Sequence, residues 1–325
     1  MGRYLVTGCA GFIGAQVVSL LLERGDEVWG LDDLNEAYDP RLKHWRLERL
    51  EQSTGFRFQK VDIAEPEVGE ALTESAGFDA VINLAARAGV RQSVEDPASY
   101  LRTNILGTLN LLEFCRRQGI QKFVQASTSS LYGLHSPKPF REDADVSRPL
   151  SPYAASKGGA EALCHSYAHL HGLDITILRY FTVYGPAGRP DMSIFRFIQW
   201  IAEGRPLRLY GDGSQERDFT YVEDIARGTV AALKPLGFEI INLGGDSPVS
   251  MLEVIAQIES KLKAKAKVEA HEPAPADMPA TWADIRKARR LLGWEPHISL
   301  DEGLDRTIAW YQAERAWASQ VATGD

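Results

Sequence analysis

Short runs of β-branched and other apolar residues alternate with longer stretches of helical periodicity through the first half of the chain. The runs that predict strands are residues 4–7, 27–31, 57–61, 80–84, 122–126 and 175–179. Helical patterns cover residues 13–24, 40–52, 67–75, 97–118 and 152–171, and several of them begin at a proline or end at a glycine. This alternation predicts an α/β fold with a doubly wound parallel sheet, covered by helices on both faces.

The pattern becomes less regular after about residue 185. A helical stretch at 193–203, short strands at 207–210 and 239–243, and helices at 251–263 and 300–313 follow. The Ala- and Lys-rich stretch before Pro273 predicts a solvent-exposed helix end and a stiff loop. We therefore expect a larger domain formed by residues 1–185, with a return segment near 222–245, and a smaller mixed α/β lobe formed mainly by residues 186–325.

The composition is that of an ordinary globular protein, with 325 residues of which 44% are hydrophobic and 25% charged. A net charge of -8 argues against a nucleic-acid partner, so any phosphate ligand must be bound by local groups. No apolar run is long enough for a membrane helix, and we expect no membrane association. The three cysteines lack C-x-x-C spacing, which argues against a disulfide framework and a metal site and favours a cytoplasmic protein.

A glycine-rich turn follows the first predicted strand directly, with Gly8, Gly11 and Gly14 at the junction with a helix. Absent side chains let the backbone approach a pyrophosphate, toward which the N–H groups of the first helical turn point. Asp32 ends the second strand, where a carboxylate can accept hydrogen bonds from the ribose hydroxyls. A 2′-phosphate would meet like charge there, so the sequence favours NAD over NADP.

Basic residues in the following loop, Arg41 and Lys43, weaken that preference because they could face a phosphate. Asp62, which follows the third strand, fits either of two interpretations: a helix cap or a contact to the adenine amine.

Tyr153 and Lys157 lie one helical turn apart near the start of a predicted helix. An ammonium beside a phenol stabilises the phenolate, so we expect the pKa of Tyr153 to be lowered and this side chain to act as a base toward an alcohol. The fifth strand leads into a hydroxyl-rich turn, Thr128, Ser129 and Ser130, at the edge of the sheet where ligands bind. These hydroxyls can donate hydrogen bonds without offering a strong acid or base.

Together the glycine-rich turn, the turn at 127–133, the Tyr153-x-x-x-Lys157 pair and the segments 179–186 and 211–219 resemble the extended short-chain dehydrogenase/reductase superfamily, in particular its nucleotide-sugar epimerases. Segments 32–47, 84–91 and 277–284 are most similar to those of UDP-glucuronate 4-epimerases. The sequence departs from these relatives at Asn83 and Arg87, where histidine and glutamine are more common, and at Ala276, where glycine is usual.

This resemblance implies a Rossmann-type NAD-binding domain, a nucleotide-sugar-binding lobe and an isomerase that converts UDP-glucuronate to UDP-galacturonate through a 4-keto intermediate. Tyr153 would take the proton of the 4-hydroxyl while C4 gives hydride to tightly bound NAD+, with Lys157 and Thr128 completing the catalytic group. The alternatives are a UDP-glucose 4-epimerase, a decarboxylating UDP-glucuronate enzyme and a non-catalytic NAD(H)-sensing protein. A homodimer formed through the helices at 97–118 and 152–171 is also implied.

The 4-keto form of a uronate is a β-keto acid, prone to lose carbon dioxide, so donors at Thr182 and the strand-five turn could hold its carboxylate in an unreactive orientation. Thr182 also stands where neutral-sugar epimerases commonly carry asparagine. Arg217, helped by Arg189, would hold the diphosphate, whereas Arg91 could reach an anion or simply cap its loop.

Two sets of contacts follow from the resemblance. The expected cofactor contacts are Gly8, Gly11, Phe12, Ile13, Gly14, Asp32, Asn35, Asp62, Ile63, Leu84, Ala85, Ala86, Asn104, Tyr153, Lys157 and Tyr180. The expected substrate contacts are Arg91, Thr128, Ser129, Ser130, Thr182, Arg189 and Arg217.

Overall fold

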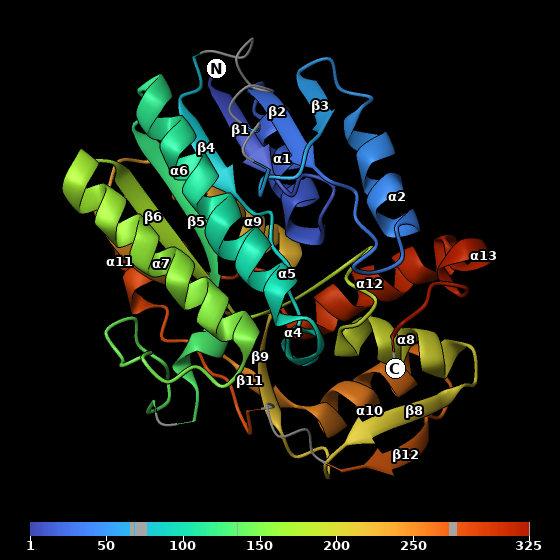
Figure 1. Cartoon of the computed structure of the whole chain (residues 1–325). Coiled ribbons are helices and arrows are strands. Elements are labelled where there is room, and N and C mark those ends of the chain that lie inside the picture. The colour runs from blue at the N-terminus through green and yellow to red at the C-terminus, as the bar shows by residue number, and fades with distance from the viewer. Residues whose placement is uncertain (66–67, 69–76, 135, 273–277, 325) are drawn as a thin grey trace.

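The computed structural model, shown in Figure 1, describes the chain except for residues 66–67, 69–76, 135, 273–277 and 325. Apart from Val68, the helix expected at 67–75 therefore lies outside the described residues. The same holds for Pro273, Ala276 and Asp277.

A seven-stranded sheet forms the centre of the larger domain, with the order β10-β6-β5-β4-β1-β2-β3 and parallel pairing throughout. Its strands are β1 (Arg3–Thr7), β2 (Glu27–Asp32), β3 (Phe56–Lys60), β4 (Ala80–Asn83), β5 (Lys122–Thr128), β6 (Asp174–Tyr180) and β10 (Phe238–Leu243). The predicted doubly wound α/β sheet is confirmed. The edge strand β10 joins it late in the chain, after much of the second lobe.

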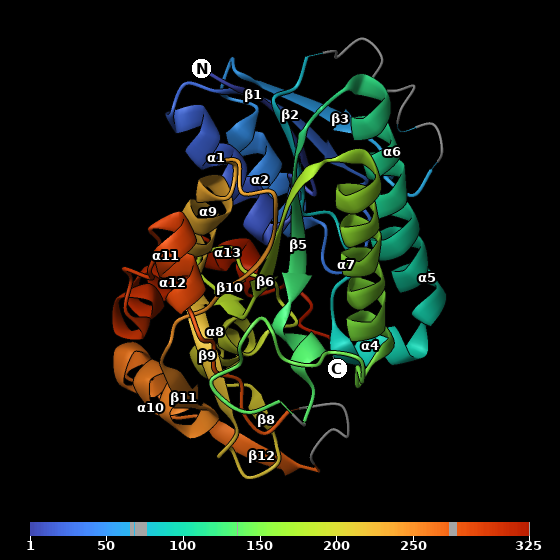
Figure 2. The same cartoon turned by 90° about the vertical axis from the view of Figure 1, so that its left-hand side faces the viewer.

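Helices cover both faces of this sheet, as Figure 2 shows with the sheet seen nearly edge-on. One face carries α1 (Phe12–Glu23), α2 (Arg41–Leu50), α9 (Val222–Ala231) and α11 (Arg286–Leu292). The other carries α5 (Pro97–Leu101), α6 (Gly107–Gln118) and α7 (Pro152–His171). Neighbouring strand residues alternate between the faces: Leu5 packs in the α6–α7 core and Val6 in the α1–α9 core.

The helix α7 has the predicted bounds because its end signals are strong. The Ser151 side chain accepts a hydrogen bond from the backbone N–H of Ala154 (3.2 Å), Pro152 occupies the first turn, and Gly172 ends the helix in the left-handed conformation. The single helix predicted at 97–118 is wrong in detail. A π-helical turn at Arg102–Leu106 separates α5 from α6, which rotates the following helix relative to a regular α-helical continuation.

The second lobe packs α8 (Ser193–Ala202), α10 (Met251–Leu262) and α12 (Leu300–Ala313) around their own apolar core. Two small sheets lie beside them: β7 (Thr182–Tyr184), β9 (Glu216–Tyr221) and β11 (Pro248–Ser250) in one, and β8 (Pro206–Tyr210) with β12 (Lys267–His271) in the other. Helix α10 ends within the Ala- and Lys-rich stretch, at Leu262, close to the predicted 263. The sequence did not predict the strand that follows, in which residues 267–271 pair in parallel with β8. Tertiary pairing has overridden the helix propensity of Ala and Lys here.

A C-terminal segment follows α13 (Arg315–Ala318) and offers its backbone carbonyls to side chains of α2 and α8. Gln199 donates to the carbonyls of Ala318 (3.0 Å) and Val321 (2.9 Å). Arg41 donates to Gln320 O (2.8 Å) and Arg196 to Thr323 O (2.9 Å). The segment thus ties α2 of the large domain to α8 of the second lobe. Among the described residues, no helix has the length and apolar character needed to cross a membrane.

The guanidinium of Arg46, on α2, connects the same two regions from inside the molecule. It is 4% exposed and donates to the carbonyls of Ala10 (2.9 Å) and Ala187 (2.6 Å) and to the phenol of Tyr38 (2.8 Å). Ala10 belongs to the glycine-rich turn and Ala187 to the start of the second lobe. Arg46 therefore fixes the distance between them.

Replacing Arg46 by Met should lower the free energy of unfolding by about 3 kcal/mol, because buried carbonyls of both regions lose their donor. Urea unfolding measures this change. Arg49→Met is the matched control on the same helix: Arg49 is half exposed and its ion pair with Glu314 (3.3 Å) is worth under about 1 kcal/mol. Equal losses in the two variants would contradict the bridging role of Arg46.

Candidate active site

A cavity of about 470 Å³ runs along the carboxyl edge of the large sheet. The glycine-rich turn and the ends of β2 and β4 line one part of it, and the turn after β5, the first turns of α7 and the β7 region line the other. The predicted site residues in its lining are Gly8, Gly11, Phe12, Ile13, Gly14, Asp32, Asn35, Asp62, Ile63, Leu84, Ala85, Ala86, Thr128, Ser129, Ser130, Tyr153, Lys157, Tyr180, Thr182 and Arg189. The structure thus brings together residues from widely separated parts of the chain.

The glycine-rich turn is packed too tightly for side chains. A Cβ at Gly14 would lie 2.0 Å from the carbonyl oxygen of Gly8, and one at Gly8, whose φ is +69°, would lie 2.7 Å from the backbone nitrogen of Ala85. Helix α1 begins at Gly11 without a side-chain cap, so its first N–H groups are directed to the cavity end of the helix. This arrangement fits the pyrophosphate of a dinucleotide.

The carboxylate of Asp32 lies beside this turn and is 6% exposed. It accepts a hydrogen bond from the backbone N–H of Ala10 (3.1 Å), and Lys43 Nζ lies 3.7 Å from it. Burial raises the pKa of Asp32, while Lys43 acts in the opposite direction. Arg41 instead donates to Asp39 and to the carbonyl of Gln320. Because carboxylates engage both basic residues of the loop, the geometry favours ribose hydroxyls over a 2′-phosphate at Asp32.

The carboxylate of Asp62 lies in the turn after β3. It accepts a hydrogen bond from the backbone N–H of Ala64 (2.9 Å) and pairs with Arg102 (2.8 Å). It also lines the cavity next to Ile63. This hydrogen bond and a ligand contact are therefore compatible at this position.

Tyr153 lies half-buried in the cavity wall, where its ring meets that of Tyr100 edge-on at 6.1 Å. The predicted lowering of its pKa is wrong for this structure. Burial raises the pKa of Tyr153, and the groups that oppose this are the Thr128 hydroxyl and the Arg189 guanidinium rather than Lys157. Burial also lowers the pKa of Lys157 itself to about 8. The Lys157 ammonium can therefore lose its proton at mildly alkaline pH, and a negative charge nearby helps to keep it protonated.

The sugar end of the cavity is rich in neutral hydroxyls with one strong cation. The Thr128 hydroxyl accepts a hydrogen bond from the backbone N–H of Ser130 (3.1 Å), and Thr182 begins β7 on the other side. Arg189 donates to the carbonyl of Ala88 (3.1 Å) and pairs with Asp191 (2.5 Å). A sugar with several hydroxyls and an acidic group would find matching partners here.

Three predicted contacts lie outside the cavity lining. Asn104 is buried behind it, where its side chain accepts from the backbone N–H of Arg87 (2.9 Å) and donates to the carbonyl of Arg87 (3.0 Å) and to Ser156 Oγ (2.8 Å). Asn104 thereby ties the loop after β4 to helix α7. Arg91 stacks over the ring of Tyr210 at 4.0 Å, and Arg217 donates to the carbonyl of Glu216 (2.8 Å).

Sequence reasoning missed other lining residues, among them Tyr100 and Asp191. Asp191 could have been recognised from its spacing, because an acid two residues after Arg189 in a loop can pair with it. Nothing near Tyr100 in the sequence points to its contact with Tyr153, since that contact depends on how α5 packs against α7.

Comparison with known proteins gives consistent results. Residues 4–244 match the model of the NAD dependent epimerase/dehydratase family. A UDP-glucuronate 4-epimerase of Thermodesulfobacterium geofontis is 57% identical over 95% of this chain and 96% of its own length. UDP-glucuronate 4-epimerase 4 of Arabidopsis thaliana is 42% identical over 94% of this chain and 74% of its own length. The crystal structure of UDP-glucuronic acid 4-epimerase from Bacillus cereus, in complex with UDP-glucuronic acid and NAD, superposes with a TM-score of 0.91 at 40% identity, over 96% of this chain and 99% of that one.

Gly14→Ala should remove bound dinucleotide, because its Cβ cannot coexist with the carbonyl of Gly8 and the turn must move. The NAD released on denaturing the purified protein measures this. Gly119→Ala is the control. Unlike Gly14, Gly119 has a left-handed conformation (φ +72°), but its Cβ would meet nothing within 4 Å, so this variant should lose about 1 kcal/mol of stability and keep its NAD. Full NAD content in Gly14→Ala would contradict the assigned pyrophosphate site.

Proposed function

This chain belongs to the NAD dependent epimerase/dehydratase family, and we propose that it is an NAD-dependent nucleotide-sugar 4-epimerase that interconverts UDP-glucuronate and UDP-galacturonate. One observation carries the proposal: Tyr153, Thr128 and Thr182 line the same cavity as the glycine-rich turn. A sugar held at the first three residues therefore lies within one enclosed space with the dinucleotide. The high identity to UDP-glucuronate 4-epimerases over nearly the full chain supports this substrate.

In this proposal Tyr153 takes the proton of the sugar 4-hydroxyl and later returns it to the 4-keto oxygen. Bound NAD+ supplies the hydride acceptor and donor at C4. Thr128 hydrogen-bonds the reacting oxygen, and the charge of Lys157 stabilises the phenolate form of Tyr153 when the site is loaded. Burial raises the pKa of Tyr153. In this proposal the lowering of that pKa, which the proton transfer requires, therefore takes place when NAD+ and the sugar are bound.

The carboxylate of the uronate needs separate control, because the 4-keto form loses carbon dioxide when the C5–C6 bond aligns with the ketone. The Thr182, Ser129 and Ser130 hydroxyls face the cavity and can hold the carboxylate away from that alignment. The turn after β5 carries no carboxylate between Ser127 and Ser130 that could move a proton at C5. Both features favour epimerisation over decarboxylation or dehydration.

The charge of the diphosphate would be balanced by Arg189, together with Arg217 and Arg91 at the lobe boundary.

The two lobes divide this work. Residues 1–185, with the return segment near 222–245, would hold NAD tightly, and residues 186–325 would mainly hold the nucleotide sugar. We also propose a homodimer through α5, α6 and α7, on which Leu101 and Leu170 are exposed large apolar side chains. The three free, buried cysteines fit a cytoplasmic enzyme.

Purified protein mixed with UDP-glucuronate and no added cofactor should form UDP-galacturonate, followed by NMR of the anomeric protons. Product without added NAD would show that the cofactor is retained through purification. A pentose product would contradict the role given to the hydroxyls, and turnover of UDP-glucose alone would contradict the proposed uronate substrate.

In the same assay Tyr153→Phe should lose at least about 100-fold in turnover while keeping its NAD, since it lacks the base. An unchanged rate would show that Tyr153 is not the base, whereas bound NAD without any turnover in the wild type would fit an NAD(H)-sensing protein.

Thr182→Asn should lower kcat/KM for UDP-glucuronate about tenfold, because a donor to the charged carboxylate is replaced by a larger amide. NAD content should not change, since Thr182 lies at the sugar end. Thr182→Ser keeps the hydroxyl and is the matched control, expected to stay near the wild-type value. Equal kcat/KM in wild type and Thr182→Asn would sink the assignment.

A further inference from the structure

A buried carboxylate, Glu161, lies one helical turn beyond Lys157 on α7 and is 7% exposed. Ser127 Oγ donates to its Oε1 (2.5 Å), and Arg179 donates through Nε to Oε1 (3.0 Å) and through Nη2 to Oε2 (2.7 Å). Ser127 and Arg179 are register partners at the ends of β5 and β6. The carboxylate thus binds the carboxyl ends of two central strands to the helix that carries Tyr153 and Lys157.

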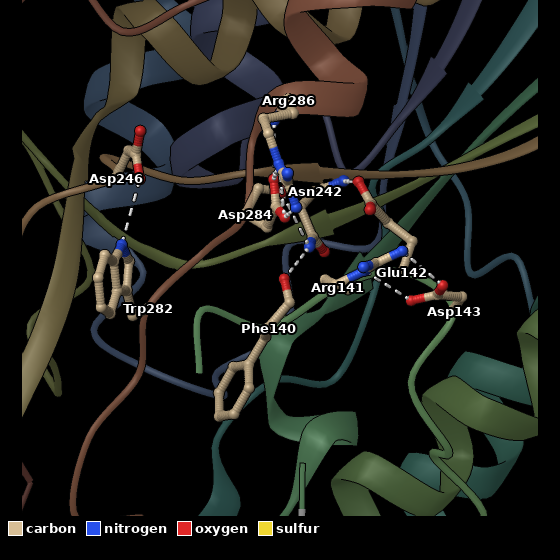
Figure 3. Close-up of polar contacts among 9 residues, drawn as sticks. All are labelled: Phe140, Arg141, Glu142, Asp143, Asn242, Asp246, Trp282, Asp284 and Arg286. Atoms are coloured by element: carbon tan, nitrogen blue, oxygen red, sulfur yellow. Dashed lines mark hydrogen bonds and ion pairs between the residues drawn. The ribbon is translucent and has the colours of Figure 1, made fainter. Parts of the chain in front are cut away.

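The guanidinium of Arg179 is itself fixed from its far side. Its Nη1 donates to the phenol of Tyr132 (3.1 Å), which in turn donates to Asn242 Oδ1 (2.6 Å). Asn242, on β10, donates through its side chain to the carbonyl of Phe140 (2.8 Å) and through its backbone N–H to Glu142 Oε1 (2.9 Å), as Figure 3 shows. With Arg179 only 2% exposed, this chain of contacts leaves Glu161 little freedom to turn away.

The charges around Lys157 can be stated for each packed element. On α7 itself the charged group is the carboxylate of Glu161, which favours the ammonium, whereas the thiol of Cys164 stays neutral because burial raises its pKa. The polar groups of the other elements packed against α7 lie as follows. Asn104 bonds Ser156, Glu113 of α6 accepts from Tyr167, and Arg179 of β6 pairs with Glu161. On α4 (Val90–Glu95), Arg91 stacks on Tyr210 and Glu95 lines the cavity, while Tyr100 of α5 meets Tyr153, and none of these three acts on the pKa of Lys157. Glu161 is therefore the carboxylate that acts on Lys157.

We propose that Glu161 is a positioning residue for the epimerase reaction, whose clamped carboxylate keeps the buried Lys157 ammonium charged beside the cavity. This inference rests on the function proposed above. Burial lowers the pKa of Lys157 to about 8 even though the carboxylate of Glu161 opposes this lowering. Without the carboxylate, Lys157 would lose its proton at a pH where the enzyme still has to stabilise the Tyr153 phenolate.

The same two strands supply a matched control. At their other ends Lys122 and Asp174, also register partners, form a second buried ion pair (2.5 Å), with side chains 8% and 19% exposed. Asp174 also accepts from the backbone N–H groups of Leu236 and Gly237. Asp174→Asn should therefore destabilise the packing of β5 against β6 without changing the charge near Lys157. It separates an effect of lost stability from an effect of the lost Glu161 charge.

The test is the pH profile of kcat for the NAD-loaded enzyme with UDP-glucuronate between pH 6 and 10. Glu161→Gln should move the basic limb about one pH unit lower, the effect of removing one nearby opposite charge. Glu161→Asp keeps the charge and should restore most of the wild-type limb, and Asp174→Asn should leave the limb in place. A uniform loss of kcat in Glu161→Gln without a shift of the limb, or the same shift in Asp174→Asn, would overturn the proposal.

If Glu161→Gln does not fold, the double variant E161Q/R179Q removes the carboxylate together with the guanidinium that it would strand. A downward shift is again expected, but a smaller one than in Glu161→Gln, because the loss of the Arg179 cation offsets part of the effect of losing the carboxylate. An unshifted limb overturns the inference there too. Absence of turnover in the wild-type enzyme would instead reject the proposed function, so the two failures are distinguishable.

Discussion

The guanidinium of Arg46 satisfies backbone carbonyls from both lobes at once, and the shape of the cavity depends on that contact. A planar guanidinium has five N–H donors in fixed directions, so Ala10 and Ala187 cannot move apart without leaving buried polar groups unpaired. One carbonyl belongs to the glycine-rich turn and the other to the start of the second lobe. The spacing between these two walls of the cavity is thus set by a residue that does not itself line the cavity.

Helix α7 is located by a second set of buried contacts. Asn104 connects its Ser156 to the backbone of Arg87, and Glu161 connects its next turns to β5 and β6. Tyr153 and Lys157 therefore project from a helix that is held at the sheet edge along two sides. Preorganisation of this kind matters for proton transfer, where a misplacement of about 1 Å can cost 100-fold in rate.

Local signals made much of this predictable. The parallel sheet followed from the alternation of patterns, and α7 from its cap, its proline and Gly172. The π-helical turn at Arg102–Leu106 left no trace in the periodicity, and residues 267–271 form a strand because β8 offers an edge. The bond between Glu161 and Arg179 depends on the register of two strands and a helix, which spacing along the chain does not reveal. For the same reason the pKa of Tyr153 was predicted in the wrong direction: one turn of helix places Lys157 near it, but burial acts more strongly.

The C-terminal segment is anchored through its own backbone carbonyls, which every amino acid possesses. Side chains at Gln320 and Thr323 are therefore free to change during evolution as long as the chain keeps its path, whereas the donors Arg41, Arg196 and Gln199 are not. An alignment of relatives should then show a tail of constant length whose exposed side chains drift, opposite a few invariant donors, with an apolar residue kept at Val321, which is buried against Leu42 and Phe195. A gap or an insertion in that tail would be a more telling sign of altered lobe coupling than a substitution of its exposed side chains.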